Sequence, residues 1–200
     1  DFYLGFDRRA DLKNQYSSEI EKLLPNEFLY ALGVYMQLCA HIEKNASALI
    51  VCLSGVFPSD ANWLENYWKN RKRSTSDLIR ELKRCSSKAE EFGFSSELKT
   101  LCSWINEFKR NRHLAAHGAF YGSPSGFLRV DYVHNDGSFT EPLYRTDRTA
   151  ITMDLVDEAI RDADRIFIVL IDMLEKIREG LYREVSFHTI PVVVHPNSQP

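Results

Sequence analysis

The residues whose types and spacing suggest chemistry lie in an arginine- and histidine-rich segment from Lys109 to Gly118. In a helix, residues three, four and seven apart share one side, so Arg110, His113 and His117 are expected to project from a common face. Arginine holds a phosphate through paired hydrogen bonds, and histidine titrates near neutral pH. Metal-free RNA cleavage needs these groups: a base for the 2′-hydroxyl, an acid for the departing 5′-oxygen and a cation for the phosphorane.

We therefore predict a catalytic set in which His117 is the base or the acid and Arg110 stabilises the charge on the phosphate. Asn111 is expected to orient the phosphate or a histidine by hydrogen bonding. The candidate assisting residues are Arg112, His113 and Tyr121. No metal and no other cofactor is expected. His113 and His117 have the H-x-x-x-H spacing, but Leu114 stands where a zinc protease has glutamate, and no third ligand is evident.

The elements that must position this segment are expected to be helices, because apolar residues recur at three-to-four spacing along most of the chain. Serine or threonine caps and glycine stops divide the pattern. The expected long helices cover residues 27–53, 77–92, 95–117 and 153–181. A short helix is expected at 17–24, and either a short helix or an ordered loop at 60–73.

One stretch has a different period. Residues 127–134 alternate apolar and polar, Asn135-Asp136-Gly137 is a turn signal, and residues 139–144 can return as a second strand. The expected fold class is therefore all-α, a helical bundle with a β-hairpin at about 127–146 inserted before the last long helix. The expected domain spans residues 1–182, and the pattern leaves open whether the tail at 183–200 is a strand-like arm or a loose segment.

Composition limits the classes of function. The chain has 200 residues, of which 44% are hydrophobic and 26% charged, as in an ordinary globular domain. A formal net charge of -3 argues against a protein that coats nucleic acid, but it permits a small basic cleft. No apolar run reaches the roughly 18 residues of a membrane span, and no signal peptide is visible, so we expect a cytoplasmic protein with no membrane partner. Because the sequence starts at Asp1, it leaves open what precedes that residue.

The motif and its context resemble a known family. The chain resembles HEPN domains over roughly residues 20–182. The resemblance lies in Arg-Asn…His-Gly near the end of a helix, followed by an intervening segment and then a long amphipathic helix. The motif of that family is an arginine, usually followed by a polar residue, with four to six residues before a histidine. Arg110 precedes His117 by six intervening residues and Arg112 by four, so both registers fit. The helical phase favours Arg110, because seven residues make nearly two turns, and Arg112 stays open.

The resemblance implies a helical bundle that commonly forms a homodimer, with two Arg/His motifs facing each other across the interface. It implies a metal-independent endoribonuclease that leaves a 2′,3′-cyclic phosphate, in an antiviral defence or toxin–antitoxin setting. RNA, and an antitoxin or another defence-system protein, are the implied partners. The alternative is a catalytically inactive HEPN module for RNA or nucleotide binding, or for protein assembly. A third interpretation is a plain helical interaction domain in which Arg110 and His117 support packing.

Two further features of residues 60–73 have an ordinary and a functional interpretation. The basic run at 69–73 is either a solvated helix face or a contact for an RNA backbone. Trp63, Tyr67 and Trp68 are either packing residues or platforms for base stacking.

Overall fold

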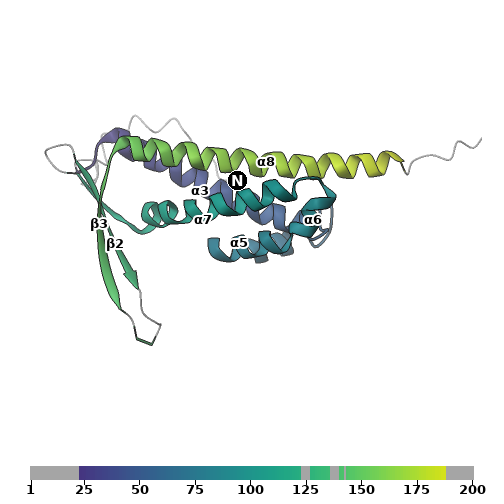
Figure 1. Cartoon of the computed structure of the whole chain (residues 1–200), viewed down its shortest axis with the longest axis horizontal. Helices are drawn as coiled ribbons and strands as arrows, with labels where there is room; N and C mark the ends of the chain where they lie inside the picture. The colour runs from purple at the N-terminus through teal and green to yellow at the C-terminus, as the bar shows by residue number, and fades with distance from the viewer. Residues whose placement is uncertain (1–22, 123–126, 136–139, 142, 188–200) are drawn as a thin grey trace, which may run out of the picture. The chain divides into compact units, whose positions relative to one another are not determined.

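The computed structural model describes residues 23–122, 127–135, 140–141 and 143–187. These residues form six helices and a three-stranded antiparallel sheet (Figure 1). In chain order the elements are α3 (Asn26–Leu53), α4 (Trp63–Arg71), α5 (Thr75–Arg84), α6 (Ser86–Glu91), α7 (Ser95–His117), β1 (Ala119–Gly122), β2 (Leu128–Asn135), β3 (Tyr144–Ile151) and α8 (Met153–Phe187). The described chain is therefore mainly helical, with a small sheet between its last two helices.

The long helices follow the sequence pattern. The helices predicted at 27–53, at 95–117 and from 153 onward are confirmed as α3, α7 and α8. Gly93, with a φ of 74°, separates α6 from α7, and the Thr152 hydroxyl caps α8 by accepting the Leu155 N–H at 3.3 Å. The last helix runs beyond residue 182, through Phe187. The short helix expected at 17–24 lies almost entirely outside the described residues, and the tail after Phe187 lies outside them completely.

The prediction of one helix at 77–92 is wrong, because the chain forms α5 and α6 with a break at Cys85. Cys85 has ψ near 3°, a turn conformation that ends the regular helix without glycine or proline. Ser74 is the cap of α5, since its hydroxyl oxygen accepts the Asp77 N–H at 3.2 Å. Residues 60–73, which the pattern left open, contain the short helix α4.

The expected β-hairpin is correct in kind but wrong in its bounds. The second strand is β3 at Tyr144–Ile151 instead of residues 139–144, and the short strand β1 was not predicted. The strand order is β1-β2-β3, and Tyr121 of β1 lies opposite Arg129 of β2. The expected mainly helical fold with an inserted β-hairpin is therefore confirmed in coarse form, with three strands in the sheet instead of two. Most side chains of β3 are exposed, so this strand lacks the alternating pattern that would have revealed it.

The chain divides into two compact units, and the first comprises residues up to Glu43 together with Ser103–Phe167. It therefore holds the first part of α3, the last part of α7, the sheet and the first part of α8. Leu24, Phe28 and Leu128 form a buried cluster with partly buried residues of the sheet and α8. The other buried side chains of this unit are Ala31, Tyr35, Cys39, Ile42, Ile105, Phe108, Val130, Ala163 and Ile166. The sheet, which follows α7 in the chain, therefore packs against residues of α3 and α8.

The second unit comprises Lys44–Cys102 and the chain from Ile168 onward. Its large buried side chains include Leu49, Ile50, Leu53, Leu78, Ile79, Leu82, Phe94, Leu98, Leu101, Leu170, Met173 and Ile177. The helix α4 has no buried residue; Trp63 and Tyr67 stack on each other with ring centroids 6.2 Å apart. In the basic run, Lys69 pairs with Glu65 at 2.7 Å and Arg73 with Glu81 at 3.2 Å. These contacts favour the ordinary interpretation of the run as a solvated, ion-paired surface.

Candidate functional site

Two kinds of contact on its core-facing side hold the end of α7 in place. Ile105 and Phe108 are buried, and the Arg112 guanidinium pairs with the Glu43 carboxylate of α3 at 3.0 Å. The Arg112 side chain is 25% exposed and that of Glu43 16%. Because this ion pair is partly shielded from water, it ties α7 to α3 and orients the last turns of α7.

His113 and His117 form a pair on a second side of the helix. Their ring centroids lie 5.8 Å apart, and His113 is half-buried whereas His117 is exposed. Burial lowers the pKa of His113 below its ordinary value, and the charges of Arg112, His117 and Lys109 lower it further, against the opposing effect of Glu43. His113 is therefore neutral at neutral pH. Its Nδ1 atom is buried and has no hydrogen-bond partner among the described residues.

Gly118 sets the turn that follows the histidine pair. Its N–H donates to the Leu114 carbonyl at 2.8 Å, and a Cβ atom here would collide with the Val130 side chain and with that same carbonyl. Only glycine fits this close approach of helix and sheet. The turn leads directly into β1, where Tyr121 is exposed and lies 5.1 Å, from ring centroid to guanidinium carbon, from Arg129.

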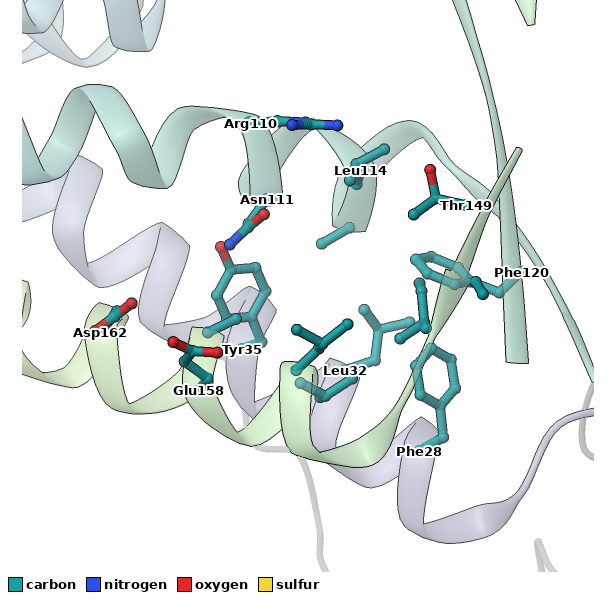
Figure 2. A pocket seen from close by; sticks show the side chains of 16 residues that line it. Phe28, Leu32, Tyr35, Arg110, Asn111, Leu114, Phe120, Thr149, Glu158 and Asp162 are labelled. Carbon is teal, nitrogen blue, oxygen red and sulfur yellow. The ribbon is translucent and has the colours of Figure 1, made fainter. Parts of the chain in front are cut away.

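A cavity of about 400 Å³ opens beside the same turns of α7 (Figure 2). Arg110 and Asn111 line it from α7, Tyr35 from α3, and Glu158 and Asp162 from α8. Its remaining wall is mostly apolar and includes Phe28, Leu32, Leu114, Phe120, Ile151, Leu155 and Val156. A smaller cavity of about 180 Å³ adjoins it, sharing Asn111, Ala159 and Asp162.

The structure thus divides the predicted site residues among different environments. Arg110 and Asn111 line the cavity, His113 and His117 contact each other, and Arg112 is engaged by Glu43. Tyr121, in contrast, packs with Arg129 on the sheet. The predicted role of Asn111, to orient a phosphate or a histidine, stays a prediction; among the described residues Asn111 lines the cavity.

Sequence reasoning missed the three ionisable residues that line the cavity together with Arg110: Tyr35, Glu158 and Asp162. Tyr35 belongs to the apolar stripe of α3, where it is indistinguishable from a core residue. Glu158 and Asp162 are four residues apart and therefore share one face of α8, which was a usable signal. Exposed carboxylates at this spacing are, however, common on helices, so the signal was weak.

In the part of the chain that the structure describes, no three His, Cys, Asp or Glu side chains gather closely enough to hold a metal ion. The same residues include no helix that is both long and apolar enough to cross a membrane. No protein-family model matches the sequence, and no curated protein and no solved structure is significantly similar to it.

Proposed function

We propose that this chain is a HEPN-like, metal-independent endoribonuclease that cleaves RNA at the end of α7. The observation that supports this best is the pair of imidazoles, His113 and His117, with ring centroids 5.8 Å apart. Arg110 lies one turn before His113 and has no ion-pair partner among the described residues. A base, an acid and a cation for one phosphate are thereby available on consecutive turns of one helix.

In the proposed reaction the environment of His113 assigns it the role of base, and His117 and Arg110 take the remaining roles. Because its pKa is lowered, neutral His113 accepts the proton of the 2′-hydroxyl. The 2′-oxygen attacks phosphorus, the bond from phosphorus to the 5′-oxygen breaks, and protonated His117 donates its proton to that oxygen. Arg110 stabilises the additional negative charge of the phosphorane. The products are a 2′,3′-cyclic phosphate and a 5′-hydroxyl.

The proposed assembly is a homodimer in a defence or toxin–antitoxin setting, with RNA and an antitoxin or other defence-system protein as partners. In the unit that holds the site, Tyr30 is 77% and Leu155 52% exposed. Burial of these two side chains on dimerisation would add apolar contact area to such an interface.

The test is cleavage of a mixed RNA pool in EDTA. The wild type is compared with His117→Ala and with a matched control, His41→Ala, because His41 is an exposed histidine of the same unit. We expect the wild type and His41→Ala to yield cyclic phosphate ends, and His117→Ala to cleave about 10²–10⁴-fold more slowly. Equal cleavage by His117→Ala, or intact RNA with all proteins, would overturn the catalytic assignment.

The second candidate function is a catalytically silent module that binds RNA or a nucleotide or mediates assembly. The Arg112–Glu43 ion pair favours it, because in the register with four intervening residues the arginine of the motif is engaged in holding helices together. This candidate predicts RNA that is bound but left intact, with affinity reduced by Arg110→Ala and unchanged by His117→Ala. If the segment only supports packing, Arg110→Ala instead lowers the melting temperature without changing RNA affinity.

A further inference from the structure

The cavity beside the Arg/His segment has the size and wall of a ligand site. Its volume of about 400 Å³ falls within the roughly 300–1,000 Å³ that is usual for sites of small ligands. Its wall includes the rings of Phe28 and Phe120, whose centroids are 5.2 Å apart, and the ring of Tyr35. A flat, largely apolar body such as a nucleobase packs well against aromatic rings.

The Tyr35 hydroxyl is a buried donor that lacks an acceptor. Tyr35 is 4% exposed, and its hydroxyl has no hydrogen-bond partner among the described residues. Burial raises the pKa of Tyr35, so the hydroxyl keeps its proton. The nearby Cys39 thiol affects that pKa, but a thiol is a weak acceptor and forms no hydrogen bond of good geometry here. Figure 2 shows the hydroxyl pointing toward the Asn111 amide inside the cavity. An acceptor on a ligand would remove the cost of this unsatisfied donor.

Two carboxylates supply acceptors to the same cavity. Glu158 and Asp162 lie one turn apart on α8, and both line the cavity (Figure 2). Neither has an ion-pair partner within the described part of the chain. Like charges at this spacing destabilise a helix slightly, and a ligand with N–H donors would offset that cost. The cavity therefore presents an aromatic wall, carboxylate acceptors and the donors of Tyr35, Asn111 and Arg110.

We propose that this cavity binds the guanine base of an RNA substrate, with a carboxylate of α8 on its Watson–Crick edge; the inference rests on the proposed ribonuclease function. Guanine places two N–H donors, at N1 and N2, side by side, and they match the two oxygens of one carboxylate. Its O6 atom accepts from Tyr35 or Asn111. Adenine and cytosine place a ring-nitrogen acceptor beside their amino group, and uracil flanks its single N–H with two carbonyls. None of these three bases offers a carboxylate two adjacent donors.

The position of Arg110 connects the base to the reactive groups. Arg110 lies at the edge of the cavity (Figure 2), and the helical rise places His113 about 4.5 Å further along the axis and His117 about 10 Å. A phosphate held by Arg110 on the 3′ side of the seated guanosine thus extends toward both imidazoles. The enzyme cleaves after guanosine.

The test measures binding of guanosine 3′-monophosphate by titration calorimetry, against the adenosine, cytidine and uridine 3′-monophosphates. The variants are Glu158→Gln and Asp162→Asn. The control is Asp157→Asn, which neutralises an exposed carboxylate of the same helix that does not line the cavity. We expect the guanosine nucleotide to bind at least tenfold more tightly than the others. At least one of Glu158→Gln and Asp162→Asn should abolish that preference, while Asp157→Asn retains it. All three sites are exposed, and melting curves check that the variants fold.

Several outcomes would overturn the proposal: equal binding of the four nucleotides, no binding of any, or a preference that survives in both cavity variants. His117→Ala separates this inference from the proposed function, because it should still prefer guanosine 3′-monophosphate over the other three nucleotides although it no longer cleaves RNA. A wild type that cleaves RNA without a preference for guanosine disproves the guanine site and leaves the ribonuclease assignment standing. A protein that binds guanosine 3′-monophosphate specifically but leaves RNA intact supports the guanine site and disproves the ribonuclease assignment.

Discussion

Two sides of the last turns of α7 differ in what supports them. On the cavity side, Asn111 and Leu114 line a wall that includes side chains of α3 and α8, and Arg110 lies at its edge. On the histidine side, His113 and His117 contact each other near the surface, and His117 is exposed. One short helical segment thus lines a cavity and presents a pair of histidines, because successive residues of a helix point in different directions.

The largest expected effect is a loss of stability on the cavity side of α7. Phe28 is 1% exposed and belongs to both the cavity wall and the buried cluster of its unit. Phe28→Ala removes a large buried ring, so we expect the free energy of unfolding to fall by about 3–5 kcal/mol. His117→Ala, on the exposed side, should change it by less than about 0.5 kcal/mol. Urea denaturation of both variants checks this. Equal losses would show that the two sides do not differ in support.

A smaller loss of stability is expected to distinguish Arg112 from Arg110, the two arginines of the motif. Arg112→Gln removes the guanidinium that pairs with the partly buried Glu43 carboxylate, and we expect a loss of about 1–2 kcal/mol in the free energy of unfolding. The matched Arg110→Gln change should stay within about 0.5 kcal/mol, because Arg110 is exposed. Denaturation midpoints of the pair provide the measurement. If Arg110→Gln proves the more destabilising change, the assignment of Arg112 to structure and Arg110 to phosphate is wrong.

The smallest expected effect concerns pH and His113. Its pKa in the folded chain is below the ordinary value of 6.5, so between these two pKa values the unfolded chain binds more protons than the folded one. The contribution of His113 to stability is therefore fully present above pH 6.5 and is lost as the pH falls below that value. His113→Gln removes this dependence.

Unfolding free energies of both proteins, measured at about pH 7.5 and about pH 5.5, test the sign of this linkage. The wild type should lose stability relative to His113→Gln at the lower pH. A relative gain at the lower pH would mean that the folded environment favours the charged imidazole, and His113 would then be the wrong choice for the base.

The sequence was most informative where one face of an element is buried. The stripes of α3, α7 and α8 recur every three to four residues, and their helices appeared close to the predicted bounds. Where both faces are polar, as in β3, there was no periodicity from which to read a strand. The break at Cys85 was equally hidden, because no glycine or proline marks it.

For the site, the sequence by itself determined that Arg110, His113 and His117 lie on neighbouring turns of one helix, because the spacing within a helix is fixed by its geometry. Only the tertiary structure decided that Arg112 is engaged by Glu43, which is 69 residues away in the chain. It also decided that Tyr35, Glu158 and Asp162 share a cavity with Arg110. The physical reason is that such contacts join residues of different helices, and a local pattern carries no information about which faces meet when the chain packs.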